Sequence, residues 1–103
     1  MKKPRQFPPL PKMVDGPVGP FRVVLGTIDN ERSDEENFGV WSELHREMRI
    51  NKDHPRWQQW VSYFHEHTHV ALSDSGVDEM LSKKQMEAVC DAVATARFRE
   101  RFG

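Results

Sequence analysis

The apolar positions of this chain follow a strand-like spacing in its first half and a helical spacing in its second half. Residues 21–28 are apolar and β-branched, which predicts a strand. Side chains alternate loosely over residues 38–50, and this alternation predicts one or two further strands joined by a tight connection. The acidic and polar run from Asp29 to Asn37 predicts a loop between these two regions.

A first helix is predicted from its start signal, its stripe and its stop. Asp53-His54-Pro55 is typical of a helix start, because a polar cap is followed by proline in the first turn. Gly76 is typical of a helix end. Between these signals, apolar and small residues recur every three to four positions, at Trp57, Val61, Phe64, Thr68 and Leu72.

A second helix is predicted to start at Ser82-Lys83-Lys84-Gln85, which has the pattern of a capping box. Its stripe runs through Met86, Val89, Cys90, Val93 and Arg97. The helix is expected to continue close to Arg101. The elements together predict an α+β fold, with a small antiparallel or mixed sheet of two or three strands followed by two packed helices.

The first 20 residues hold all but one of the seven prolines. Proline fixes φ and lacks an N–H, so we expect residues 1–20 to form an extended arm that is flexible or draped over the surface. A docking peptide for an aromatic groove is the alternative. With 103 residues, of which 37% are hydrophobic, residues 21–103 are expected to form a single domain.

Charge and composition argue against several classes of function. The 15 basic and 16 acidic residues give a net charge of −1, without the basic excess that nucleic-acid binding favours. No apolar run approaches the roughly 20 residues of a membrane span, and prolines stand where a secretory signal would be apolar. A single cysteine favours a reducing, cytoplasmic location.

The candidate chemistry lies on the first predicted helix, which contains His65, Glu66 and His69 as His-Glu-x-x-His. Two residues four positions apart share a helix face, so both imidazoles can bind one metal ion. Glu66, adjacent to the first histidine, can take the proton of a water molecule that zinc activates. This pattern predicts a zinc site with a catalytic glutamate.

The second predicted helix supplies a third donor. Glu87 and Asp91 are four residues apart and share a helix face. Catalytic zinc has three protein ligands, so Glu87 is the expected third ligand, while Asp91 is expected to hydrogen-bond a ligand histidine. The carboxylates of the connecting loop are alternative donors: Asp74, Asp78 and Glu79. His67 points away from the other two histidines on a helix, and we expect it to be solvated.

His65-Glu66-x-x-His69 followed by Glu87-x-x-x-Asp91 resembles the gluzincin group of zinc metallopeptidases. The order of a short sheet, a His-Glu-x-x-His helix and one more helix resembles their minimal, zincin-like forms, which occur in phages and mobile elements. The resemblance implies Zn²⁺ bound by the two histidines and Glu87, with Glu66 as general base and Asp91 as support. Larger members carry a further His or Tyr for the tetrahedral intermediate, which this chain lacks after Asp91.

The expected function is therefore zinc-dependent hydrolysis of peptide bonds in a peptide or protein substrate, in the cytoplasm, or in the host cytoplasm for a phage-encoded chain. The substrate is expected along an edge strand within residues 38–50. No nucleic-acid or membrane partner is expected, and the oligomeric state is left open. Four residues are candidates for stabilising the transition state: Arg97, Tyr63, His54 and His45. The alternative function is a non-catalytic zinc-binding interaction module.

Overall fold

The computed structural model describes residues 7–28, 39–42 and 44–103. It contains a mixed sheet, of spatial order β1-β2-β4-β3, and two long helices. The acidic run from Asp29 to Asn37, predicted as a loop, lies outside the described residues. Along the chain the elements are β1 (Met13–Asp15), β2 (Pro20–Gly26), β3 (Gly39–Ser42), β4 (Glu47–Asn51), α1 (Arg56–Asp74), the 3-10 helix η1 (Val77–Met80) and α2 (Lys83–Phe102).

The α+β class is confirmed, but the predicted count of two or three strands is wrong, because the described sheet has four. The extra strand, β1, lies inside the proline-rich segment and pairs antiparallel with β2. The predicted boundary after residue 20 falls within β2. β2 runs parallel to β4, and β3 pairs antiparallel with β4 at the edge of the sheet.

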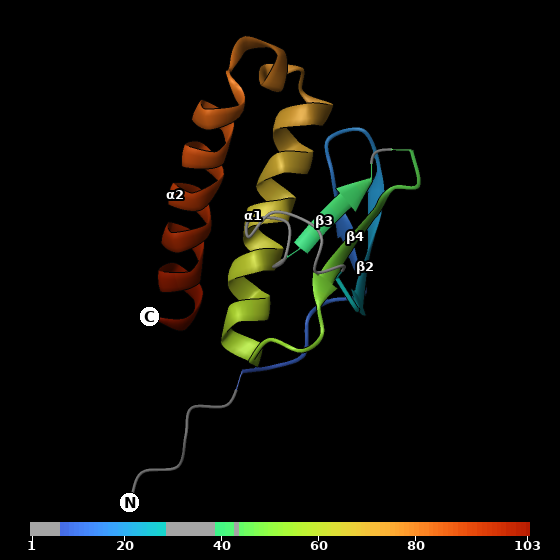
Figure 1. Ribbon diagram of the computed structural model, residues 1–103, viewed down its shortest axis with the longest axis vertical. Coiled ribbons are helices and arrows are strands. Elements are labelled where there is room, and N and C mark those ends of the chain that lie inside the picture. The colour runs from blue at the N-terminus through green and yellow to red at the C-terminus, as the bar shows by residue number, and fades with distance from the viewer. Residues whose placement is uncertain (1–6, 29–38, 43) are drawn as a thin grey trace, which may run out of the picture.

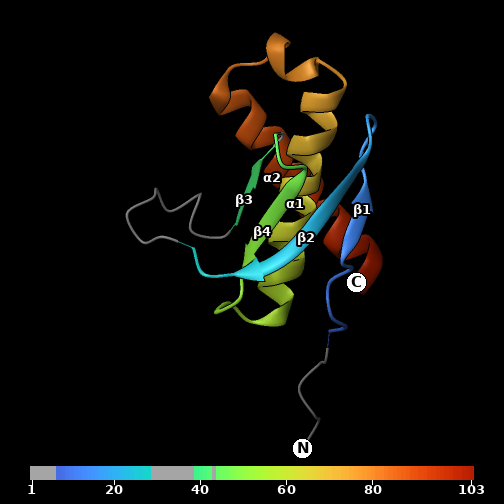
Figure 2. The same ribbon diagram turned by 90° about the vertical axis from the view of Figure 1, so that its right-hand side faces the viewer.

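Helix α1 lies between the sheet and α2 (Figures 1 and 2). The sheet face that meets α1 carries Phe21, Met48 and Ile50, each fully buried. Met48 and Ile50 alternate with exposed Arg49, so the period of two in β4 places one face on the core. The core is completed from the two helices by Trp60, Tyr63, Phe64, Val70 and Ala94.

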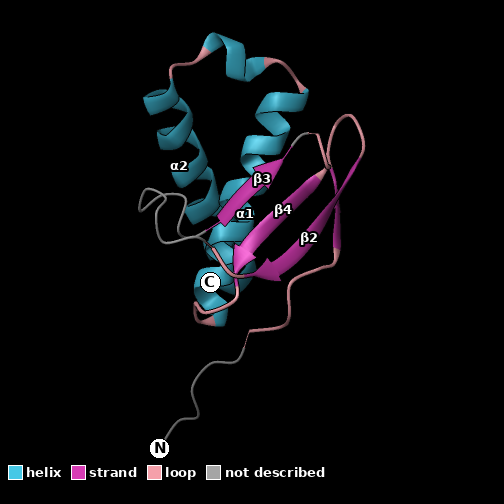
Figure 3. Cartoon of the chain, turned by 45° about the vertical axis from the view of Figure 1, so that its right-hand side comes forward, coloured by secondary structure: helices cyan, strands magenta, loops and turns pink. Residues whose placement is uncertain are grey.

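The ends of both helices agree with the sequence signals. Gly76 follows α1 with φ of 78°, the left-handed conformation that glycine adopts without a Cβ clash. At the start of α2, Gln85 N donates to Ser82 Oγ (3.1 Å) and Ser82 N donates to Gln85 Oε1 (2.8 Å). This capping box stabilises the first turn of α2 and thereby sets the position of the following residues along the helix axis. Figure 3 shows the η1 segment bridging the two helices.

The described start of the proline-rich segment, residues 7–11, packs on the helices. Trp60 Nε1 donates a hydrogen bond of 2.8 Å to the carbonyl of Pro8, and Leu10 is buried. Phe7 packs against Phe98 and Phe102 of α2. None of the described helices is long and apolar enough to cross a membrane.

Candidate metal centre

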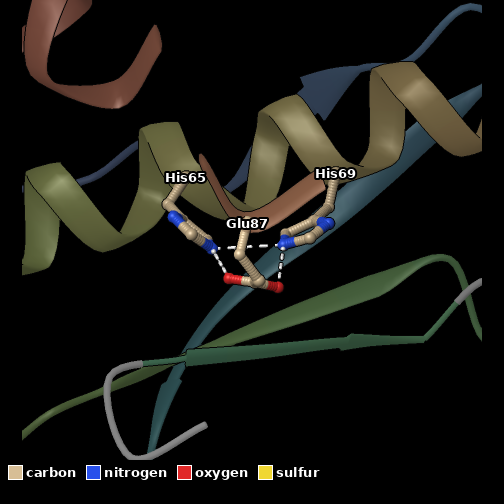
Figure 4. Close-up of side chains that lie close together, drawn as sticks. All are labelled: His65, His69 and Glu87. Carbon is tan, nitrogen blue, oxygen red and sulfur yellow. Dashed lines mark hydrogen bonds and ion pairs between the residues drawn. The ribbon is translucent and has the colours of Figure 1, made fainter. Parts of the chain in front are cut away.

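Three side chains from two helices converge on one point (Figure 4). His65 and His69 project from the same face of α1, and their Nε2 atoms lie 3.1 Å apart. The carboxylate of Glu87, on α2, reaches both rings, with Oε2 3.1 Å from His65 Nε2 and Oε1 3.0 Å from His69 Nε2. These three residues form the one group in the described part of the chain with donor atoms placed to hold a metal ion.

The spacing of these donors matches a tetrahedral zinc site. Two ligand atoms that each lie 2.0–2.1 Å from zinc are about 3.3 Å apart at the tetrahedral angle. The three donor-to-donor distances here are 3.0–3.1 Å, so small rotations of the side chains are enough to accommodate the ion. The His65 side chain is 17% exposed, that of His69 10% and that of Glu87 22%, which leaves the site accessible from one side.

Asp91 fixes the orientation of His65. Its Oδ1 lies 2.8 Å from His65 Nδ1, one helical turn beyond Glu87. A neutral His65 that donates its Nδ1–H to Asp91 presents an unprotonated Nε2 to Glu87 and His69. The lone pairs of the two Nε2 atoms and of the Glu87 carboxylate face one another at 3.0–3.1 Å, and they repel unless a proton or a cation lies between them. The hydrogen bond to Asp91 therefore gives His65 the tautomer that a metal ligand requires.

The local electrostatics favour a cation. Burial lowers the pKa of His69 below its ordinary value, so that its neutral, ligand-competent form is favoured, although Glu87 opposes this shift. Cys90, fully buried on α2, has its pKa raised to about 12, first by burial and then by the negative charge of Glu87, Glu66 and Asp91. The negative charges of three carboxylates thus act on the same buried thiol. The Cys90 thiol therefore stays protonated and packs as a small apolar side chain.

Glu66 is buried beneath the start of β3. Its residue exposure is 6%, and a Cβ at Gly39 would lie 3.3 Å from Glu66 Cγ. The absence of a side chain at Gly39 therefore lets β3 approach α1 closely at the glutamate. Trp41, two residues along β3, stacks on His69 with the ring centroids 6.4 Å apart. The His-Glu-x-x-His motif predicted neither contact. For Trp41 the sequence does carry a signal, because an aromatic residue stands in a region whose alternation predicts a strand.

The alternative donors in the connecting loop do not belong to the convergent group. Asp74 instead binds Arg46, and Asp78 and Glu79 form part of η1. The prediction that His67 is solvated is wrong. It is half-buried, its Nδ1 accepts a hydrogen bond of 2.8 Å from Arg97, and its Nε2 lies 3.1 Å from the Asp15 carbonyl.

Two of the four candidates for stabilising a transition state lie on the face of α1 opposite the convergent donors. Tyr63 stacks on His67, and Arg97 donates a hydrogen bond to it. His45 is exposed in the turn before β4. His54 precedes α1 beside Asn51, and the nine helical steps from Arg56 to His65 separate the helix start from the site by about 13 Å.

Comparisons with protein-family models, with curated proteins and with solved structures found no match to this chain. The resemblance to gluzincins therefore stays a prediction from the sequence motif.

Replacing Asp91 with asparagine is expected to weaken zinc binding. Partners of this kind, which hydrogen-bond a ligand histidine, contribute roughly 10- to 100-fold to metal affinity. We expect the lower end of that range, because the Asp91 side chain is 73% exposed. Competition with a chromogenic chelator measures the change. Asp78→Asn, which removes the same charge from η1, is the control, and equal zinc affinities in both variants would contradict a role for Asp91.

Proposed function

We propose that this chain is a zinc-dependent peptide hydrolase of the gluzincin type. One observation carries the proposal. Distances of 3.0–3.1 Å separate His65 Nε2, His69 Nε2 and the Glu87 carboxylate oxygens from one another. Asp91 Oδ1 lies 2.8 Å from the other ring nitrogen of His65, Nδ1. The two histidines, Glu87 and Asp91 thus have the spatial relations that their expected roles need.

The proposed role of each residue follows from where it lies. His65, His69 and Glu87 would hold the zinc ion, which would supply a coordinated water with a pKa lowered to about 7 and a Lewis acid for the substrate carbonyl. Glu66 follows His65 directly on α1 and lies beneath β3. We assign it the role of general base that takes the proton of the attacking water and passes it to the leaving amine nitrogen.

A peptide or protein substrate fits the position of β3. This strand forms the edge of the described sheet, and its only described strand neighbour is β4. Its outward-facing N–H and C=O groups are suited to pairing with an extended peptide beside His69 and Glu66. A cytoplasmic location, or the host cytoplasm for a phage-encoded chain, belongs to the same proposal.

The alternative is a non-catalytic zinc-binding interaction module, which calls for a closed site with four protein ligands. The convergent group among the described residues has three donors. Asp91, the nearest further carboxylate in the pattern, is bonded to His65 Nδ1. A fourth position left for water favours the enzyme.

The experiment compares wild type and His69→Ala for zinc content and for cleavage of an unfolded, fluorescently labelled protein. Wild type is expected to hold one zinc per chain and to lose cleavage on chelation, with recovery on adding one equivalent of zinc. His69→Ala is expected to lose both, because two ligands hold zinc poorly. Equal zinc in both chains contradicts the metal site, whereas cleavage by metal-free wild type contradicts the proposed mechanism.

A further inference from the structure

A cavity of about 680 Å³ lies on the face of α1 opposite the metal centre. Its lining comes from the proline-rich segment, from α1 and from the C-terminal half of α2. The start of α1 and the end of α2 lie at the same end of the molecule (Figure 1). Pro8 and Pro9 form one wall, and Trp60 and Phe64 supply aromatic surface. The volume is within the roughly 300–1,000 Å³ that small-molecule and peptide pockets enclose.

A tyrosine hydroxyl is part of the lining of this cavity. Tyr63 is 5% exposed as a residue, and its ring packs against those of Trp60 and Phe64, at centroid distances of 5.5 and 5.4 Å. Its hydroxyl forms no hydrogen bond with a described residue and is not among the buried atoms that lack a partner, so it is open to solvent. It can therefore donate a hydrogen bond to an acceptor that enters the cavity.

Two arginines lie over the aromatic lining. Arg97 sits 4.4 Å above the Phe64 ring and Arg101 5.1 Å above the Trp60 ring, both measured to the ring centroid. Arg101 forms no ion pair with a described residue, so its guanidinium N–H groups are available to an acceptor. Glu100 also lines the cavity, and the three charged residues together give it a net charge of +1. This balance suits one carboxylate and disfavours a doubly charged phosphate, which Glu100 would repel.

We propose that the cavity binds the C-terminal carboxylate of a peptide that ends in a large apolar residue. The carboxylate accepts hydrogen bonds from Tyr63 Oη and Arg101, while the terminal side chain packs between the prolines and the Trp60 and Phe64 rings. The cavity is large enough for several residues, which favours a chain end over a single amino acid. This site is separate from the metal centre and does not depend on the proposed hydrolysis.

The test titrates the full chain calorimetrically with acetyl-Ala-Ala-Phe as the free acid and as the amide. The acid is expected to bind at least about tenfold more tightly, since hydrogen bonds to a charged group are the strong ones. Tyr63→Phe, which removes one oxygen, and Arg101→Gln are each expected to weaken the acid about tenfold and to leave the amide unchanged. Arg99→Gln, an exposed arginine on the same helix that does not line the cavity, is the matched control.

Several results would overturn this proposal. These are absence of binding to wild type, equal affinities for acid and amide, or wild-type affinity for the acid in both Tyr63→Phe and Arg101→Gln. Tighter binding of phenyl phosphate would overturn the choice of carboxylate, and acetylphenylalanine binding as tightly as the tripeptide would overturn the choice of a peptide chain end. Unchanged binding of the acid to His69→Ala is expected, and its loss would contradict a separate site.

Discussion

Replacing Glu66 with glutamine is expected to abolish peptide cleavage while leaving zinc in place. Glutamine keeps the length and shape of the buried side chain but cannot accept a proton. Loss of a general base costs roughly 10²- to 10⁴-fold in rate. Zinc content should not change, because the proposed ligands are His65, His69 and Glu87. A cleavage assay on unfolded protein, run beside elemental analysis of the same sample, measures both effects.

The control for this variant is Glu79→Gln, which makes the same chemical change on the exposed surface of η1. It should retain wild-type cleavage and zinc. Retention of cleavage by Glu66→Gln would refute the assignment of Glu66 as base. Loss of zinc from Glu66→Gln would instead assign Glu66 a role in holding the metal site together.

The second large effect concerns stability, and it arises where α1 ends against the sheet. Asp74 receives two hydrogen bonds from the guanidinium of Arg46, at 2.8 and 2.9 Å, and one of 3.2 Å from Val18 N. The Asp74 side chain is 1% exposed, and that of Arg46 26%. Arg46 NH2 also donates to the Gly19 carbonyl at 2.6 Å. This ion pair ties the β1–β2 hairpin and the β3–β4 turn to the C-terminal end of α1.

Asp74→Asn is expected to lower the free energy of unfolding by roughly 3 kcal/mol at neutral pH. Removing one partner of a buried ion pair costs about 3–5 kcal/mol, and the partial exposure of Arg46 places this case at the low end. Urea denaturation measures the loss. Asp78→Asn, whose side chain makes no hydrogen bond to a described residue, is expected to change stability by less than about 0.5 kcal/mol.

The loss on Asp74→Asn should also depend on pH. The hydrogen bonds from Arg46 hold the pKa of Asp74 below its ordinary value. The stabilisation is therefore complete above the unfolded pKa of about 3.9, and it disappears as pH falls through the lower folded value. The difference in stability between wild type and Asp74→Asn should shrink below about pH 4. A difference that stays constant down to pH 2 would contradict the ion pair.

The ion pair also accounts for an unusual backbone conformation. Arg46 has φ of 48°, a left-handed conformation that few residues other than glycine adopt. Its contacts with Asp74, Gly19 and the Phe21 ring, 4.1 Å from the guanidinium carbon, hold the side chain in place. These contacts offset the cost of the strained backbone.

The convergence of the candidate ligands could be predicted from the sequence because their geometry is mostly local. His65 and His69 are one helical turn apart wherever the helix lies, and the same holds for Glu87 and Asp91. The stop signal at Gly76 and the capping box at Ser82 limit how the two helices can be joined. A short connection between antiparallel helices then brings the two pairs of side chains together.

The features that sequence reasoning missed depend on contacts between distant segments. β1 has three residues and no apolar alternation, so no pattern predicts it. The signal for a hairpin is the turn-forming pair Gly16-Pro17 that follows it. His67 is held by Asp15 and Arg97, which lie 52 and 30 residues away. Asp74 was a candidate metal donor by its place in the loop, whereas its partner Arg46 lies 28 residues earlier. No periodicity in the sequence encodes such pairings.

Anomalous scattering from crystals grown with zinc shows whether His65, His69 and Glu87 hold a zinc ion. Data collected above and below the zinc absorption edge should give a peak at about 2.0–2.2 Å from His65 Nε2, His69 Nε2 and a Glu87 oxygen. A zinc-specific peak only elsewhere on the chain, or no peak between these three side chains, would contradict the proposed zinc site.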